Sequence, residues 1–213
     1  MNQRLPEPLE QWFTSRGWTP RRHQRDMLTA ARSGNHALLV APTGAGKTLA
    51  GFLPTLTDLI ESPTEGLHTL YVSPLKALAV DVRRNLLTPI EEMDLPIRVE
   101  TRTGDTPSDR KVRQRARPPQ ILPTTPESLS LLLSYPDSLM FAHLRTVIVD
   151  EVHAFASQKR GDLLNLSLSR LQTINPALRR VALSATVADV DAYRAWLAPD
   201  GDINAVIPVI GES

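Results

Sequence analysis

Short apolar segments alternate with longer amphipathic segments along most of the chain. The apolar segments are too short for helices, and their consecutive apolar positions predict strands buried on both faces. The predicted strands are His36–Ala41, Thr69–Ser73, Ile97–Thr101, Gln120–Leu122, Thr146–Asp150, Arg180–Ser184 and Asn204–Ile207. Helical periodicity predicts helices over Leu9–Ser15, Arg21–Ser33, Thr48–Ile60, Leu75–Glu92, Pro107–Arg117, Pro126–Leu133, Gly161–Ile174 and Asp189–Leu197. This alternation predicts one α/β domain with a mainly parallel central sheet, helices on both faces and a short helical leader.

Three predicted helices begin with a hydroxyl residue followed by proline. A Ser or Thr side chain at the N-cap accepts a hydrogen bond from a free backbone N–H, and proline suits the first helical position. We therefore expect N-caps at Ser73, Thr106 and Thr125. Pro123 has no N–H to donate to a sheet, so either the strand before it stops at Leu122 or the missing donor faces a side without a partner.

Composition narrows the class of protein. The chain has 213 residues, 41% of them hydrophobic, which is long enough for one domain with a substantial core. Its 24 Lys and Arg residues balance 23 Asp and Glu residues, which excludes a disordered tail and a wholly basic nucleic-acid coat. The absence of cysteine excludes disulfides, Cys-ligated zinc and a thiol nucleophile. With no signal peptide or membrane-length apolar run, we expect a cytoplasmic location and no membrane partner.

A glycine-rich turn joins the first predicted strand to a helix, with the sequence APTGAGKT at residues 41–48. Gly44 and Gly46 allow a tight turn whose backbone N–H groups, together with the helix N-terminus, face phosphate oxygens. Lys47 can reach the β- and γ-phosphates, and the Thr48 hydroxyl can bind Mg²⁺. The general pattern begins with Gly where this chain has Ala41, and the alternative is an ordinary turn with a surface lysine. The flanking strand and helix favour an ATP–Mg²⁺ site that includes Pro42, Thr43, Gly44, Ala45, Gly46, Lys47 and Thr48.

An acidic pair, Asp150-Glu151, ends the buried strand Thr146–Asp150 and opens the string DEVH. Ligands of open parallel sheets bind at the carboxyl ends of strands, so this pair is expected beside the glycine-rich turn. Asp150 is predicted to bind Mg²⁺ through its water shell, and Glu151 to orient and deprotonate the attacking water. The alternative, an ordinary acidic helix cap, does not explain why both motifs occur in one chain.

The order APTGAGKT, DEVH and Ser184-Ala185-Thr186 resembles the first RecA-like domain of superfamily 2 DExH-box helicases. The blocks SPLKAL, TRTGDT and TTPESL are similar to the large-helicase-related (Lhr) branch, and the opening LPEPLEQWFTSRGWTPRRHQ resembles its bacterial ligase-associated DNA damage response subgroup. This resemblance covers nearly the whole chain. It implies a RecA-like P-loop NTPase fold, with residues 1–34 as a leader and residues 35–213 as ATP-binding domain 1.

The resemblance also implies roles for individual residues. Gln24 matches the glutamine that reads the adenine edge, with Trp18 and Arg21 beside it; taken alone, Gln24 would be a solvated helix residue. A coupling set between the ATP and nucleic-acid sites is implied at His153, Ser184, Ala185 and Thr186.

The three middle blocks are expected to face nucleic acid. Helix N-termini leave backbone N–H groups that bind phosphodiester oxygens without reading the base sequence. The expected contacts, some of which shape loops, are Ser73, Pro74, Lys76, Thr103, Gly104, Asp105, Thr124, Thr125 and Glu127. Residues 110–117 hold five positive charges in eight positions, a run more typical of a solvated helix face than of a strand track.

Helicases of this type bind ATP between two RecA-like domains, and the second domain supplies an arginine finger. Only 27 residues follow Thr186, too few for a second domain. We therefore expect the N-terminal lobe of an ATP-dependent DNA helicase, which alone binds ATP–Mg²⁺, hydrolyses it poorly and does not unwind duplexes. The resemblance implies 3′-to-5′ movement in DNA repair. It implies three kinds of partner: single-stranded DNA or a duplex containing DNA or RNA, the second RecA-like domain, and DNA repair proteins.

Three alternatives remain open at this point. An RNA helicase lobe of the DEAD-box kind is disfavoured by DEVH and by the TRTGDT and TTPESL blocks. A non-catalytic module that binds nucleotide and nucleic acid fits the length. A nucleotide kinase or GTPase lacks support, because no NKxD string accompanies the glycine-rich turn.

Overall fold

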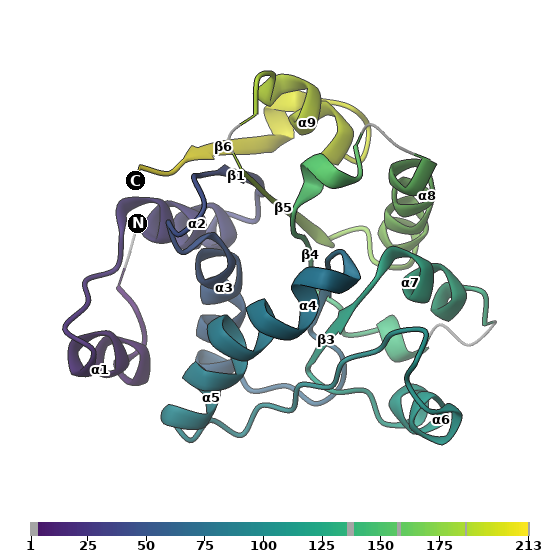
Figure 1. Ribbon diagram of the computed structural model, residues 1–213, viewed down its shortest axis with the longest axis horizontal. Coiled ribbons are helices and arrows are strands. Elements are labelled where there is room, and N and C mark those ends of the chain that lie inside the picture. The colour runs from purple at the N-terminus through teal and green to yellow at the C-terminus, as the bar shows by residue number, and fades with distance from the viewer. Residues whose placement is uncertain (1–3, 136–138, 157–158, 186, 213) are drawn as a thin grey trace.

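Six parallel strands form one sheet in the order β3-β2-β4-β5-β1-β6 in the computed structural model, which describes residues 4–135, 139–156, 159–185 and 187–212 (Figure 1). The strands are β1 (His36–Val40), β2 (Thr69–Val72), β3 (Ile121–Thr124), β4 (Thr146–Val149), β5 (Arg179–Ser184) and β6 (Val206–Ile210). The α-helices are α1 (Glu7–Ser15), α2 (Arg22–Arg32), α3 (Lys47–Glu61), α4 (Leu75–Val82), α5 (Thr88–Glu92), α6 (Ser108–Ala116), α7 (Pro126–Leu133), α8 (Lys159–Ile174) and α9 (Val190–Leu197).

The sheet lies between two helical layers, because successive strand residues point to opposite faces and both faces are buried. Ala37 and Leu39 of β1 face one cluster, which contains apolar residues of α1 to α5. Leu38 and Val40 face the other, formed with α7, α8 and α9. The predicted α/β class and parallel sheet are confirmed. The leader, residues 1–34, supplies α1 and α2, whose apolar faces pack into the first cluster.

The predicted strand Ile97–Thr101 is wrong as a strand of the sheet. Residues 97–102 run along the free side of β3 and meet it only at isolated bridges from Val99 and Arg102. On the outer side of β3, the Arg102 N–H donates to the carbonyl of Pro123 at 2.8 Å. On the other side, the N–H of Ser73, the residue after β2, donates to the carbonyl of Thr124 at 3.1 Å. Odd residues of β3 therefore face the outer edge, where the missing N–H of Pro123 interrupts no β2–β3 hydrogen bond. The expectation that the strand stops at Leu122 is therefore wrong, because β3 extends to Thr124 and the missing N–H faces away from β2, toward residues 97–102.

The helix predicted over Leu75–Glu92 contains a π-turn, η1 (Arg83–Leu87), between α4 and α5. The Thr88 N–H bonds back to the carbonyl of Arg83, five residues earlier. Pro89 supplies the reason, since proline cannot donate to the carbonyl four residues before it and its ring crowds that carbonyl. The helix widens there instead of ending.

Of the predicted hydroxyl caps, the one at Thr125 is confirmed and the one at Thr106 is wrong. Thr125 caps α7 by accepting a hydrogen bond from the Ser128 N–H, as expected. Helix α6 begins one residue later than predicted, after Pro107, and the Thr106 hydroxyl accepts from the Thr103 N–H within the preceding turn. Helix α4 likewise begins at Leu75, so the proline after Ser73 precedes the helix.

The last strand also differs from its prediction, Asn204–Ile207. The Asp202 side chain accepts a hydrogen bond from the Asn204 N–H at 2.9 Å and stabilises a 3₁₀ turn, η4 (Ile203–Ala205). Strand β6 therefore begins at Val206.

Candidate functional site

The glycine-rich turn connects β1 to α3 at the carboxyl edge of the sheet. Gly44 has φ +85° and Gly46 has φ +76°, values in the left-handed region that favours glycine. The Ala45 N–H closes the turn onto the carbonyl of Pro42 at 3.2 Å. Lys47 is the first residue of α3 and is buried against the turn. Pro42 of this turn is half-buried and Thr43 is exposed.

A histidine that the sequence analysis did not single out braces this loop. His23 of α2 is buried, and its Nε2 lies 2.9 Å from the carbonyl oxygen of Ala45. A carbonyl only accepts, so Nε2 must carry the proton in this contact. Burial lowers the pKa of His23 and favours the neutral ring. The link joins the leader to the phosphate loop, and nothing in sequence spacing would have shown it.

The residues predicted to read the base lie around one cavity beside this loop. Trp18, Arg21 and Gln24 line a hollow of about 600 Å³ together with Gly44 and Gly46. Gln24 is buried, and its Oε1 accepts a hydrogen bond from the Arg21 N–H at 2.8 Å. A Cβ added to Gly46 would lie 3.3 Å from Nε2 of Gln24. Gln24 is therefore not a solvated helix residue; its amide faces the phosphate loop.

Two aromatic rings and an arginine shape the outer wall of the cavity. Trp12 and Trp18 meet edge to face with ring centroids 5.7 Å apart. The Arg16 guanidinium lies 5.0 Å from the centroid of Trp18 and pairs with Glu92. The sequence analysis missed the wall formed by Arg84, Asn85 and Thr88 around the π-turn. The signal in the sequence was the proline inside the predicted helix after the second strand. Such a proline can cause a π-turn, and π-turns occur often at functional sites.

Asp150 forms the acidic centre beside the loop. It is buried, and its Oδ2 accepts hydrogen bonds from the Thr48 hydroxyl at 3.2 Å and from the Tyr71 hydroxyl at 2.6 Å. Burial raises the pKa of Asp150, and the hydrogen bond from Tyr71 acts in the opposite direction. Thr48 and Asp150, the two predicted metal-site residues, thus lie in direct contact. Tyr71 was missed, although its position in a strand ending at the same edge pointed to this place.

Removing the Tyr71 hydroxyl will weaken Mg²⁺-dependent nucleotide binding most at acid pH. The bond stabilises the charged form of Asp150, so Tyr71→Phe raises the pKa of Asp150 further. Affinity falls as the pH drops through that pKa, and in the variant the fall will begin at higher pH, with a loss of about tenfold on the acid side. Calorimetric titration of ATP–Mg²⁺ over a series of pH values measures this, with Tyr193→Phe as the control. Superimposable pH profiles would contradict the assignment.

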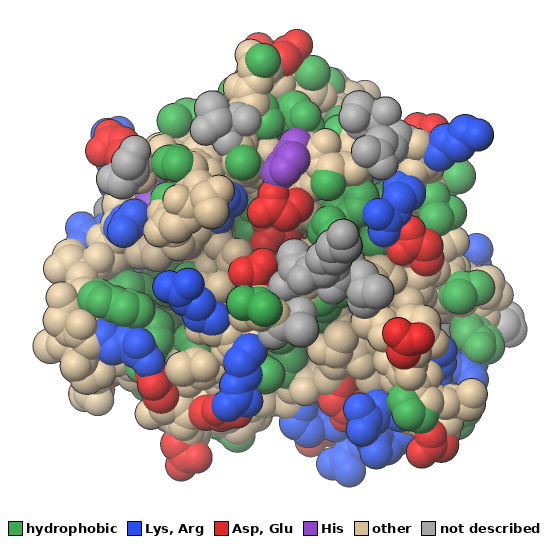
Figure 2. Space-filling view, in the orientation of Figure 1, with side chains coloured by type: hydrophobic (Ala, Val, Ile, Leu, Met, Phe, Trp, Pro, Cys, Tyr) green, Lys and Arg blue, Asp and Glu red, His purple; other side chains and the backbone are tan. Residues whose placement is uncertain are grey.

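Glu151 and His153 extend the acidic centre toward β5. Glu151 has φ +53°, an uncommon conformation for a residue with a side chain. Its Oε2 lies 3.1 Å from Nε2 of His153, whose Nδ1 lies 3.1 Å from the Ser184 hydroxyl. Figure 2 shows acidic side chains and a histidine gathered at the centre of this face, over the region where β4 ends. A continuous chain of contacts therefore runs from Asp150 to Ser184, and Ala185 follows it.

Asp81 of α4 is another carboxylate near this centre that the sequence analysis missed. Burial and the charge of Asp150 raise its pKa, whereas the positive charge of Lys47 lowers it. Asp81 thus provides a nearby opposite charge for the lysine of the phosphate loop.

The three blocks predicted to face nucleic acid meet beside the ends of β2 and β3. The Ser73 N–H donates to the carbonyl of Thr124, and the Thr124 hydroxyl donates to the carbonyl of Arg102 at 2.8 Å. Ser73 and Thr124 are fully buried, so their side chains shape loops. Gly104, Asp105 and Glu127 are exposed, and Pro74 and Thr103 are half-buried. Thr186 lies outside the described residues, and the structure describes the backbone of Lys76 but not its side chain.

The basic run of residues 110–117 lies mostly on α6. Arg113 pairs with Glu100 at 3.1 Å, Lys111 donates to the carbonyl of Gly104 at 2.8 Å, and Arg115 stacks on Tyr135. Several of its charges are therefore engaged within the domain.

A match to the DEAD/DEAH box helicase family extends over residues 21–193, from the residue before α2 to α9. The chain belongs to this family. It is 45% identical over 212 residues to the Lhr helicase and probable uracil glycosylase of Mycolicibacterium smegmatis, covering 93% of this chain and 14% of that protein. It is 43% identical over 199 residues to the ATP-dependent helicase Lhr-Core protein 2 of Thermococcus barophilus, covering 86% of this chain and 23% of that protein. The predicted resemblance to the Lhr branch is confirmed.

A solved structure of Mycobacterium smegmatis helicase Lhr bound to single-stranded DNA and AMP-PNP superimposes on this helicase domain with a TM-score of 0.85 and 42% identity. The superposition covers 98% of this chain and 28% of that one. The chain thus spans between about one seventh and one quarter of the curated Lhr relatives that it matches. Among the described residues, no helix of this helicase domain is long and apolar enough to cross a membrane.

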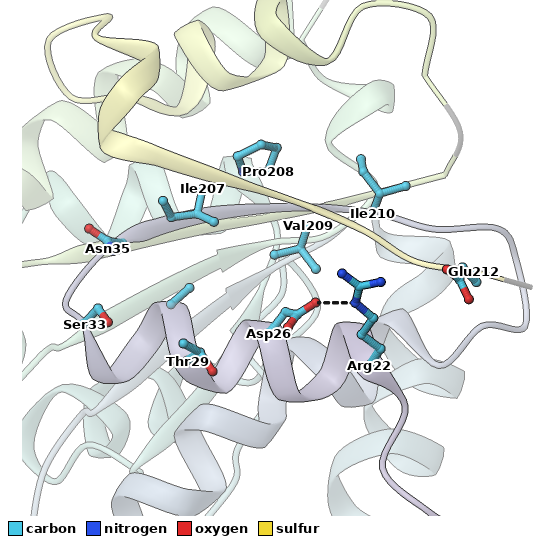
Figure 3. A pocket seen from close by; sticks show the side chains of 11 residues that line it. Arg22, Asp26, Thr29, Ser33, Asn35, Ile207, Pro208, Val209, Ile210 and Glu212 are labelled. Carbon is cyan, nitrogen blue, oxygen red and sulfur yellow. Dashed lines mark ion pairs between the residues drawn. The ribbon is translucent and has the colours of Figure 1, made fainter. Parts of the chain in front are cut away.

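A separate groove of about 550 Å³ lies between α2 and the edge strand β6 of the helicase domain (Figure 3). Ile207, Val209 and Ile210 line its strand side, and Arg22 and Asp26 pair across 3.7 Å on its helix side. It contains none of the predicted site residues.

Proposed function

We propose that this chain is the ATP-binding lobe of an ATP-dependent DNA helicase or translocase, and that it binds ATP–Mg²⁺ and single-stranded nucleic acid. In the intact protein, ATP hydrolysis drives 3′-to-5′ movement and strand separation in DNA repair, and a second RecA-like domain supplies an arginine finger. The chain alone hydrolyses ATP poorly and does not unwind duplexes. Family membership and the relatives' names support the general activity; polarity and setting rest on the Lhr resemblance.

One observation carries the proposal: a single cavity connects the amide of Gln24 to the loop of Gly44 and Gly46. A glutamine amide can donate to adenine N7 and accept from the adenine amino group, a pattern that guanine does not match. The phosphate loop supplies backbone N–H groups where the phosphates would lie. ATP therefore fits this cavity with its base at Gln24 and its phosphates at Lys47.

The residues present also suit Mg²⁺, a hard cation that prefers oxygen ligands. Thr48 and Asp150 place a hydroxyl and a buried carboxylate within 3.2 Å of each other. When bound, the ion would neutralise phosphate charge. Glu151, next in the chain, would hold the proton taken from the attacking water, and His153 would orient that carboxylate and connect it to Ser184.

The proposed face for nucleic acid is formed by the loops after β2 and β3. The exposed Gly104, Asp105 and Glu127 and the N-terminus of α7 surround it. Contacts from backbone N–H groups would bind the phosphodiester chain without reading its sequence. Binding measured by fluorescence anisotropy with single-stranded DNA and RNA of the same sequence, with and without AMP-PNP, tests this. Preference for RNA would favour an RNA helicase lobe instead.

Replacing Gln24 by glutamate will reduce the preference for ATP over GTP. Glutamate keeps the oxygen that accepts from the Arg21 N–H at 2.8 Å, but it replaces the Nε2 donor. Loss of one hydrogen bond to adenine will cut the ratio of ATP to GTP affinity by about fivefold. Calorimetric titration with both nucleotides measures the ratio, which cancels the added charge. Gln11→Glu, on the exposed face of α1, is the matched control. An unchanged ratio would remove Gln24 from base recognition.

A further inference from the structure

A second polar cavity lies at the opposite edge of the sheet from the phosphate loop. It has a volume of about 350 Å³ and is formed at the amino ends of β4 and β5 and around the C-terminal half of α3. Asp58, Thr64, His143, Arg145, Asn175 and Arg179 contribute to its lining. None of these residues belongs to the nucleotide site, and the helicase motifs leave the cavity unexplained.

Arg179 is the unusual member of this lining. Its side chain is 7% exposed, and its Nη1 has no hydrogen-bond partner among the described residues. Burial lowers the pKa of Arg179 to about 10, which keeps the guanidinium charged at neutral pH. A buried charge is costly unless it is paired, and a buried donor without a partner indicates a missing water or ion. Arg179 thus places a buried guanidinium, one of whose donors has no partner among the described residues, beside the cavity.

The surrounding charges favour an anion. Burial raises the pKa of Asp58, and the positive charges of Arg179 and Arg145 act in the opposite direction. Burial and the same two charges lower the pKa of His68 to about 4. His68 is therefore neutral at pH 7. Two guanidinium groups oppose one carboxylate, Asp58, and no ion pair within 4 Å joins either arginine to a described residue.

The cavity is also built on rigid backbone. The Arg145 N–H donates to the carbonyl of His68 at 2.9 Å, and the Arg179 N–H donates to the carbonyl of Arg145 at 3.0 Å, so the backbones of both arginines are held beside the amino ends of β4 and β5. The Thr64 hydroxyl is a second buried group without a hydrogen-bond partner in the part of the chain that the structure describes. Guanidinium and hydroxyl donors together match the oxygens of a phosphate.

We propose that this cavity binds a phosphate-class oxyanion, either free orthophosphate or a terminal phosphomonoester, between Arg179, Arg145 and the Thr64 hydroxyl. Its volume of about 350 Å³ accommodates one phosphate with several waters. The site does not depend on the nucleotide site, because the two lie at opposite edges of the sheet.

Chemical-shift titration of the ¹⁵N-labelled chain with sodium phosphate, at constant ionic strength set by chloride, tests the proposal. We expect saturable shifts at the Arg179 guanidinium and at amides of residues 58–68, 143–146 and 175–179. Arg145→Ala, an exposed position, will weaken this binding about tenfold, as expected for a charge-assisted hydrogen bond. Asp58→Asn will strengthen it, an effect that a purely structural role for these residues does not produce. Arg179→Lys tests the buried donor itself.

Two controls separate this site from the others. Arg110→Ala removes an exposed arginine of α6 and will leave the binding unchanged. Lys47→Ala will abolish shifts at the phosphate loop and spare those around Arg179.

A single-stranded oligonucleotide with and without a 5′-phosphate distinguishes a terminal phosphomonoester from free orthophosphate. Shifts confined to residues 42–48, or shifts around Arg179 that neither saturate nor respond to Arg145→Ala and Asp58→Asn, would overturn the proposal.

Discussion

Replacing Lys47 by alanine will reduce the affinity for ATP–Mg²⁺ by about 10- to 100-fold, as expected for the loss of a charge-assisted hydrogen bond to phosphate. Lys47 starts α3 and is buried against the loop of Gly44 and Gly46. Its positive charge also lies near the Asp81 carboxylate, whose pKa it lowers, so its loss leaves that carboxylate without this compensating charge where the phosphates would lie. Both effects act against nucleotide binding. Calorimetric titration with ATP–Mg²⁺ measures the loss.

Lys159→Ala is the matched control, because Lys159 is an exposed lysine at the start of another helix, α8. This variant will bind ATP–Mg²⁺ as the unchanged chain does. Circular dichroism of both variants establishes that they remain folded. If a folded Lys47→Ala variant bound ATP–Mg²⁺ normally, the glycine-rich turn would not be the phosphate site.

Replacing Glu151 by glutamine will slow ATP hydrolysis by about 1,000-fold while leaving nucleotide affinity nearly unchanged, in line with the loss of a general base. Glutamine preserves the size of the side chain and an oxygen that can accept from His153, 3.1 Å away. It cannot take a proton from the attacking water. Phosphate release in a single turnover measures the rate, first with this chain and then with this chain joined to a second RecA-like domain.

Glu65→Gln provides the control for charge, since Glu65 is exposed in the loop between α3 and β2. Its rate will match that of the unchanged chain. A Glu151→Gln variant that hydrolysed ATP at an undiminished rate would assign the proton transfer to another group. A variant that lost nucleotide affinity together with rate would point instead to a role in binding.

Much of the fold could be predicted because its signals are local. Consecutive apolar positions identified the strands that the sheet buries on both faces, and Thr125-Pro126 located the start of α7. The failures were also local in origin. Pro89 widened a helix that periodicity alone extends without interruption, and Asp202 diverted the chain into a turn before β6. Residues 97–102 were predicted as a strand because pattern does not distinguish a strand from an extended segment beside an edge.

The site was predicted less completely. The motifs located Lys47, Thr48 and Asp150, and the structure shows the contact between Thr48 and Asp150. Tyr71 was missed because its bond to Asp150 joins residues 79 apart in sequence. His23 was missed because its contact with the loop depends on how α2 packs.

By itself the sequence determined the order of the phosphate loop and the acidic pair, the alternation of strands and helices, and the glycines that adopt positive φ. These depend on backbone sterics and on burial within single elements. Only the tertiary structure decided the strand order that brings Tyr71 to Asp150, the approach of Gln24 to Gly46, and the burial of Arg179, whose Nη1 has no partner in the described part of the chain. Such contacts join residues far apart in the chain, and their formation depends on packing that periodicity does not specify.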